Sequence, residues 1–109
     1  MTISFAINAL RESTLSKIPI IKSLVIDNNL ITGKILSKIL IKEFKHQVKF
    51  ISSGSEALNL LSQDIYDLVF LDIDMPKLSS VKTCIEIRNS TIVIEKNKAI
   101  PIFAYTTNE

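Results

Sequence analysis

A short apolar run that ends in two carboxylates constrains the fold more than any other stretch of this chain. Residues 68–71 are bulky and apolar, Asp72 and Asp74 come next, and Pro76 follows. A run this short, bounded by polar residues and proline, is typical of a fully buried strand in a parallel sheet. Open α/β sheets bind ligands beyond the carboxyl ends of their strands, so Asp72 is the first candidate for a functional residue.

The composition is that of one folded domain. With 109 residues, 47% of them hydrophobic and only 2 Gly and 3 Pro, the chain is neither disordered nor of low complexity. The net charge of +2 comes from scattered charges, which excludes a nucleic-acid footprint. The sequence has no apolar run of the roughly 18–20 residues that a membrane span needs, and because residues 1–6 lack the basic and long apolar regions of a signal peptide we expect none there. Its one cysteine, Cys84, leaves no internal disulfide, so we expect a reducing compartment, the cytoplasm or the nucleus.

Strand and helix patterns alternate along the chain. We expect strands at 20–26, 48–51, 68–71 and 102–105. We expect helices at 30–44, from Ser53 or Ser55 to about 63–64, and from Ser80 onward with Val81, Cys84 and Ile85 as its apolar positions. Residues 89–98 fit either a helix end or a loop. This alternation predicts βαβ crossovers and one parallel sheet in an α/β domain.

For two single residues the sequence alone leaves the structural role open. Gly33 lies inside the helix expected at 30–44, where it either permits close packing against the sheet or has no role. His46 is the only histidine, and without ligand partners in the sequence we expect it in a solvated loop.

Polar side chains stand where three of the expected strands end. Asp27 and Asn28 follow the first strand, Asp72 ends the third, and Thr106 follows the fourth. The ends of parallel strands share one edge, so these side chains are expected to converge. Two carboxylates in a cleft repel unless they share a cation, and an all-oxygen ligand set suits Mg²⁺. A carboxylate that faces Mg²⁺ is a candidate nucleophile toward a phosphoryl group, which would give an aspartyl phosphate.

The motifs around these positions resemble the receiver domain of two-component response regulators, in particular that of fungal stress-response regulators. Four segments carry the resemblance, and the third is the most specific: 24–29, 53–58, 66–76 and 100–106. The resemblance covers about residues 20–109. It implies a flavodoxin-like (CheY-like), doubly wound parallel sheet with strand order 2-1-3-4-5.

The resemblance also implies roles for individual residues. Asp72 would be the phosphoacceptor and Thr106 the switch hydroxyl, while Mg²⁺ would be held by Asp27, Asn28, Asp72 and the backbone carbonyl of Asp74. The phosphodonor would be a histidine on a kinase or a histidine-containing phosphotransfer protein. A downstream signalling protein would read the phosphorylated state through a shift between two conformations.

This resemblance limits the chemistry and the partners that we expect. The chain would be a phosphoacceptor with at most self-phosphorylation and autodephosphorylation activity, and not a classical enzyme. We expect neither nucleic acid nor a membrane as a direct partner.

The chain departs from the family pattern in three places. Asn28 stands where the family has a second acid, so we expect a weakened Mg²⁺ affinity. Ser80 stands where the family usually has Gly, so we expect a different loop. The sequence ends at Glu109, before the family's fourth helix, its fifth strand with a Lys, and its fifth helix. We therefore expect a receiver domain at 19–109 that is incomplete at its C-terminal end. Either the sequence is a fragment of a longer chain or another segment covers the vacated face, and for the second case we expect the arm or short helix at 1–18 to do so.

Two other functions compete with the phosphoacceptor. One is a pseudo-receiver that binds partner proteins without phosphorylation. The other is a phosphotransferase or hydrolase of haloacid-dehalogenase type, which wants Asp-x-Asp followed by Thr or Val after the first strand. Here Met75 and Pro76 follow the acids, on the third strand, which argues against that class.

Overall fold

The protein is built around a sheet of four parallel strands. The computed structural model describes residues 20–74 and 79–106. Its strands are β1 (Lys22–Ile26), β2 (Gln47–Ile51), β3 (Leu68–Asp72) and β4 (Ile102–Tyr105). They are all paired in parallel, in the order β2-β1-β3-β4. This order confirms the flavodoxin-like topology, and each strand begins and ends within two residues of its predicted position.

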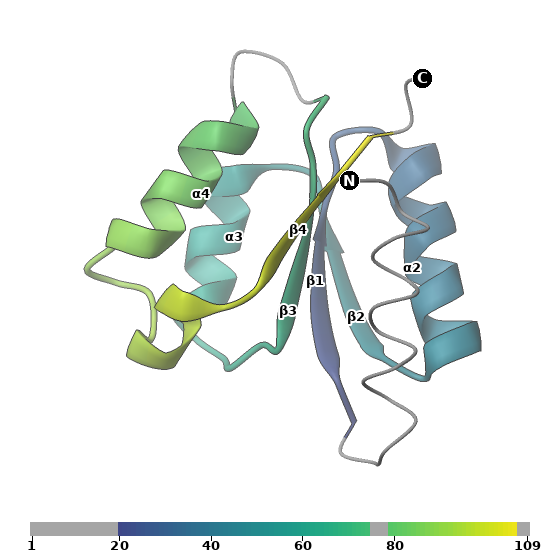
Figure 1. Ribbon diagram of the computed structural model, residues 1–109, viewed down its shortest axis with the longest axis horizontal. Helices are drawn as coiled ribbons and strands as arrows, with labels where there is room; N and C mark the ends of the chain where they lie inside the picture. The colour runs from purple at the N-terminus through teal and green to yellow at the C-terminus, as the bar shows by residue number, and fades with distance from the viewer. Residues whose placement is uncertain (1–19, 75–78, 107–109) are drawn as a thin grey trace.

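Helices cover both faces of this sheet. They are α2 (Leu30–Phe44), α3 (Gly54–Leu61), α4 (Ser79–Asn89) and a short 3₁₀ helix, η1 (Glu95–Ala99). Figure 1 shows α2 on one face of the sheet and α3 and α4 together on the other. The bounds predicted for the first helix are confirmed at both ends.

Side chains at the helix starts explain why the helices begin where they do. The side chain of Asn29 accepts hydrogen bonds from the backbone N–H groups of Ile31 and Thr32, and so caps α2. Ser53, and not Ser55, caps α3 by accepting from the backbone N–H of Glu56.

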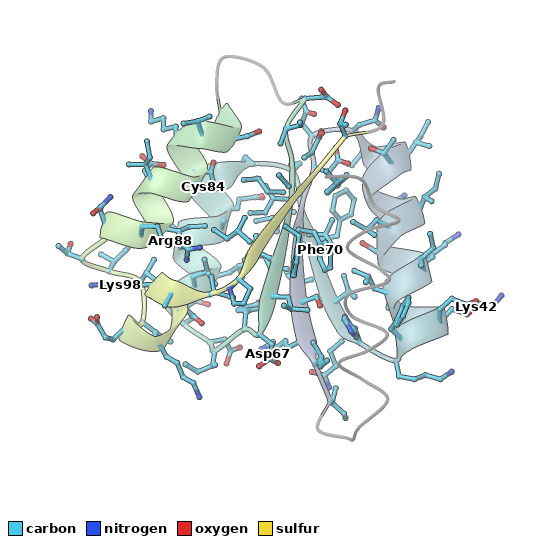
Figure 2. The ribbon with its side chains drawn as sticks, viewed as in Figure 1. Lys42, Asp67, Phe70, Cys84, Arg88 and Lys98 are labelled. Atoms are coloured by element: carbon cyan, nitrogen blue, oxygen red, sulfur yellow. The ribbon has the colours of Figure 1, made fainter. Side chains whose placement is uncertain are left out.

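The two faces of the sheet belong to two separate apolar clusters. Successive side chains of a strand point to opposite faces, so β1 places Leu24 and Ile26 toward α3 and α4 but Val25 toward α2. In β3, Val69 and Leu71 face α3 and α4, whereas Phe70 joins the cluster under α2 (Figure 2). Burial on both faces explains the continuous apolar runs in the sequence.

Gly33 permits close packing of α2 on the sheet, the first of its two predicted readings. The residue is buried, and a Cβ atom at this position would fall inside the van der Waals envelope of the Phe50 ring of β2. Only a residue without a side chain lets the two elements approach this closely.

The apolar positions predicted for the third helix are wrong in part. Val81 and Ile85 of α4 are 59% and 55% exposed, and Thr83 and Ile87 are buried instead. This rotation of α4 goes with a close contact to α3, because the Thr83 side chain lies where a Cβ on Gly54 would be.

The ambiguous stretch after α4 is a helix end followed by a turn into η1. Asn97 is fully buried there, and its side chain hydrogen-bonds three backbone groups. Its Oδ1 accepts from the N–H of Tyr66, and its Nδ2 donates to the carbonyls of Leu61 and Asp64. These bonds hold η1 against the end of α3 and position the start of β4.

His46 is buried, so the prediction of a solvated loop histidine is wrong. It is 4% exposed, and its Nδ1 lies 2.7 Å from the hydroxyl of Ser23. The chain turns inward at this point because Lys45, with φ of 61°, ends α2 in the left-handed region.

Some predictions fall on parts of the chain outside the described residues. The segment 1–18, its packing on the sheet and the loop at 75–78 are among them. Within the described residues β4 pairs with β3 alone and forms an edge of the sheet. In that part of the chain, no helix is both long enough and apolar enough to span a bilayer.

Candidate functional site

Asp27 is a buried carboxylate at the carboxyl end of β1. It is fully buried, and the strand alternation turns its side chain toward the α2 face, as it does that of Val25. Its Oδ1 accepts a 2.8 Å hydrogen bond from the backbone N–H of Asn29. Its Oδ2 accepts two hydroxyl hydrogen bonds, from Thr32 at 2.6 Å and from Tyr105 at 2.7 Å.

Asp72 is the last residue of β3 and lies at the same edge of the sheet. It is 5% exposed and is paired in register with Tyr105 of β4. The backbone N–H of Asp74 donates to its Oδ1 at 2.9 Å. Its backbone carbonyl accepts a 2.5 Å hydrogen bond from the hydroxyl of Ser80.

The electrostatics of this edge show that the two carboxylates interact. Burial is the largest cause that raises the pKa of Asp72 from 3.8 to about 6. The neighbouring carboxylates of Asp27 and Asp74 add to this rise, and the N–H of Asp74 opposes it. Asp72 is therefore held next to negative charge that disfavours its own ionisation.

The other predicted site residues lie at the rim. Asn28 is exposed beside the buried Asp27. Thr106 is half-buried just past β4, and its hydroxyl donates to the carboxylate of Asp74. The structure thus brings Asp27 together with Asp72, and Thr106 together with Asp74.

Sequence reasoning missed two residues of the site, Tyr105 and Thr32. Tyr105 is fully buried, and burial, followed by its bond to Asp27, raises the pKa of its phenol far above the usual range. The period of the strand was the available signal, because Tyr105 is two residues from Phe103 and faces the same cluster. For Thr32, the signal was its place in the first turn of the helix that follows Asp27.

The donor set at this edge fits a hard divalent cation. Among residues 20–74 and 79–106, no three His, Cys, Asp or Glu side chains form a metal-binding group. The carboxylate of Asp27 nevertheless lies close enough to disfavour the charge of Asp72, and a cation would relieve this repulsion. Asn28 directly follows Asp27, and Asp74 lies two residues after Asp72, so the ligand set expected from the sequence adds an amide and a backbone carbonyl, and such a set suits Mg²⁺.

Lysine and arginine do not balance these acids in the described part of the chain. The ion pairs there join Lys22 to Asp64 and Lys98 to Glu95, away from the acidic edge. Figure 2 places Asp67, at the start of β3, at the opposite end of the sheet from the acidic edge. The negative charge of Asp27 and Asp72 is therefore met only by hydrogen bonds from hydroxyl and N–H groups within this part.

Comparison with known sequences points to one family. The family model for the response regulator receiver domain matches residues 23–109. Stress response regulator protein 1 of Lodderomyces elongisporus is 38% identical over 62% of this chain and 19% of its own length. The protein of the same name in Meyerozyma guilliermondii is 38% identical over 77% of this chain and 38% of its own length. The chain thus spans about a fifth to two fifths of these curated relatives.

Comparison with solved structures points to the same fold. One neighbour comes from the co-crystal structure of the Saccharomyces cerevisiae histidine phosphotransfer signaling protein Ypd1 and the receiver domain of its downstream response regulator Ssk1. It has a TM-score of 0.57 and 32% identity, over 66% of this chain and 50% of the other. Another is the receiver domain of a sensor histidine kinase from Pseudomonas aeruginosa, which has a magnesium ion coordinated in its active site cleft. It has a TM-score of 0.69 and 22% identity, over 83% of this chain and 70% of the other.

The match over 23–109, the parallel 2-1-3-4 strand order and the acids at the carboxyl edge agree with one another. The chain therefore belongs to the response regulator receiver domain family of two-component phosphorelay systems.

Proposed function

We propose that this chain accepts a phosphoryl group on Asp72 from a phosphohistidine of a partner protein, with Mg²⁺ bound beside Asp72. The observation that carries the proposal is the pair of buried carboxylates, Asp27 and Asp72, at the carboxyl edge of the sheet. The donor is a histidine kinase or a histidine-containing phosphotransfer protein. The Ypd1–Ssk1 co-crystal structure, in which a receiver related to this chain is paired with such a protein, supports the second kind.

The reaction uses the carboxylate of Asp72 as its nucleophile. An oxygen of Asp72 attacks the phosphorus atom, a P–O bond forms, and the P–N bond to the donor imidazole breaks. The imidazole nitrogen keeps the electron pair and takes a proton from solvent. The N–H of Asp74 donates to Oδ1 of Asp72 and so orients the carboxylate, whose Oδ2 is the proposed attacking atom.

Residues around Asp72 prepare it for this step. Asp27, Asn28, Asp72 and the carbonyl of Asp74 would hold Mg²⁺, which supplies positive charge against the phosphoryl oxygens and the carboxylates. Since Asn28 brings no charge, the affinity for Mg²⁺ is lower than that of a site with a third carboxylate.

Thr106 is the proposed switch. Its hydroxyl donates to Asp74 in the structure, and rotation toward Asp72 would let it donate to a phosphoryl oxygen instead. The new hydrogen bond would favour a second conformation, which a downstream protein recognises. The relatives named stress response regulator support stress signalling as the context.

Exposed apolar side chains next to the site support docking of a partner protein. Leu30, Ile31 and Ile35 of α2 are more than half exposed, and Ile73, next to Asp72, is 48% exposed. Apolar groups so close to a reactive carboxylate suit a protein donor better than a small phosphate compound.

Chemical phosphorylation with a small donor tests the proposal. The wild-type protein is incubated with acetyl phosphate and Mg²⁺, and its intact mass is measured before and after hydroxylamine treatment. We expect a gain of one phosphoryl group that hydroxylamine removes, and no gain for Asp72→Asn. The matched control is Asp64→Asn, because Asp64 is an exposed acid paired with Lys22, away from the site.

The second candidate function is a pseudo-receiver that binds partners without phosphorylation. Asn28 in place of an acid, and the hydroxyls already bound to Asp27, favour it. The absence of any hydroxylamine-labile phosphoryl group on wild type, in a protein that still binds a phosphotransfer protein, would decide for this function.

A further inference from the structure

We propose that the hydroxyls of Tyr105 and Thr32 form a clamp on Asp27, which stabilises the negative charge of its carboxylate when no cation is bound. Tyr105 is then a positioning residue that lowers the affinity of the pocket for magnesium. The proposal rests on the proposed Mg²⁺ site and deepens it. It concerns residues that the family resemblance did not assign.

The geometry of the clamp is specific to one oxygen atom. A carboxylate oxygen has two in-plane lone pairs, and Oδ2 of Asp27 accepts two hydrogen bonds, from Thr32 at 2.6 Å and from Tyr105 at 2.7 Å. Oδ1 accepts the backbone N–H of Asn29, at 2.8 Å. The clamp therefore acts on Oδ2, the oxygen of Asp27 that this backbone N–H does not hold.

Burial gives the clamp its effect. Asp27 and Tyr105 are both fully buried, so the hydrogen bond between them is shielded from solvent. Hydrogen bonds to an ionised group are stronger than those between neutral groups, and a buried carboxylate without donors is costly. Tyr105 therefore stabilises the metal-free pocket, in which Asp27 and Asp72 repel each other.

This arrangement has a thermodynamic consequence. A group that stabilises the metal-free state more than the metal-bound state lowers the affinity for the metal. Removing the Tyr105 hydroxyl leaves the charge of Asp27 less compensated and frees a lone pair on Oδ2. The protein loses stability without Mg²⁺, and it gains affinity for Mg²⁺.

Tyr105→Phe tests the clamp because it keeps the buried ring and removes only the hydroxyl. The full chain is titrated with Mg²⁺ alone, and binding is followed by amide chemical shifts and by thermal unfolding in Mg²⁺ or EDTA. We expect the dissociation constant for Mg²⁺ to fall about three- to tenfold, which corresponds to a gain of about 0.7–1.4 kcal/mol in binding free energy. The melting temperature in EDTA is expected to fall, and Mg²⁺ is expected to raise it further than in wild type.

Tyr66→Phe is the matched control, because Tyr66 is also a buried tyrosine but belongs to the cluster under α3 and α4. Its magnesium affinity is expected to equal that of wild type. Thr32→Val removes the other hydroxyl, is expected to shift the affinity in the same direction, and tests the clamp if Tyr105→Phe does not fold. An unchanged or weakened affinity in the folded variants would overturn the clamp.

The outcome is distinguishable from failure of the proposed function. If Tyr105→Phe binds Mg²⁺ more tightly but wild type accepts no phosphoryl group, the clamp stands and the phosphoacceptor role falls. If wild type is phosphorylated and the magnesium affinities of wild type and Tyr105→Phe are equal, the phosphoacceptor function is supported and the clamp is refuted. If neither protein binds Mg²⁺, the clamp is refuted.

Discussion

The hydroxyl of Ser80 donates a 2.5 Å hydrogen bond to the backbone carbonyl of Asp72, and so ties the first turn of α4 to the end of β3. This contact explains how a serine is accommodated where the family usually has glycine. Ser80 is part of α4, and among the described residues other than glycine only Lys45 has a positive φ. At Ser80 the helix needs no left-handed residue, and the side chain supports the residue that carries the proposed chemistry.

Ser80→Ala is expected to destabilise the protein by about 1–2 kcal/mol, because the buried carbonyl of Asp72 loses a donor. Urea unfolding measures the change. Ser62→Ala is the matched control, since the Ser62 hydroxyl makes a similar 2.6 Å bond to the carbonyl of Asn59 in a more exposed place. The control is expected to change stability by less than about 0.5 kcal/mol. Equal losses of unfolding free energy in both variants would contradict a larger contribution from the buried Ser80 hydrogen bond.

Gly33→Ala is expected to destabilise the protein although alanine favours helices. The helix propensity of Ala contributes about 1 kcal/mol in its favour, but overpacking against Phe50 costs about 1–3 kcal/mol. In a Phe50→Leu background the clash is relieved, so Gly33→Ala becomes neutral or stabilising. A double-mutant cycle by urea unfolding measures this coupling. Additive effects of the two substitutions would contradict the close approach of α2 and β2.

Asp72→Asn is expected to stabilise the metal-free protein at neutral pH. The pKa of Asp72 is raised to about 6 in the folded state, so between about pH 4 and 6 the folded state binds more protons than the unfolded state. The stability that Asp72 contributes therefore falls as the pH rises through this window, and the cost is complete above it. The gain from Asp72→Asn is about 1–3 kcal/mol near pH 7.5 and vanishes near pH 4.

Unfolding in EDTA at several pH values measures this gain, with Asp64→Asn as the surface control. Adding Mg²⁺ is expected to reduce the advantage of the Asn variant, because the cation stabilises only the pocket with both carboxylates. A stability difference that does not vary with pH would contradict the raised pKa.

His46 is expected to make the protein less stable in mild acid. Burial lowers the pKa of His46 below 6.5, and the opposing charge of Asp67 does not reverse the shift. The unfolded state therefore binds the proton more readily, and stability is lost as the pH falls through about 6.5. His46→Asn keeps a group that can bond to Ser23 but cannot be protonated. Relative to wild type it should gain stability as the pH is lowered from 7.5 to 5.5, as urea unfolding would show; parallel pH profiles would rule the effect out.

Periodicity predicted most of the fold, because burial on both faces leaves strong marks in the sequence. The helix from Leu30 to Phe44 and the strand ending in Asp72 could be located from apolar patterns, a capping residue and prolines. Hydrophobicity alone misplaced the buried face of α4. The helix turns Thr83 toward Gly54 and leaves Val81 exposed, and no local pattern encodes such a contact between two helices.

The candidate site was predictable where it depends on strand ends and was missed where it depends on neighbours across the sheet. Asp27, Asp72 and Thr106 follow from the edge rule for parallel sheets. The bond from Tyr105 to Asp27 joins residues far apart in sequence and needs the register of β4 against β3. His46 likewise lies next to a residue distant in the sequence, because it follows α2 while its hydrogen-bond partner Ser23 lies in β1.

Transfer of a phosphoryl group from a protein donor tests the central claim most directly. The chain is mixed with a histidine-containing phosphotransfer protein that has been phosphorylated on its histidine, in Mg²⁺, and the labelled residue is located by mass spectrometry after borohydride reduction. The account predicts loss of the group from the donor and its appearance on Asp72, with none on Asp72→Asn. Retention of the group by the donor, or a label on any residue other than Asp72, would contradict it.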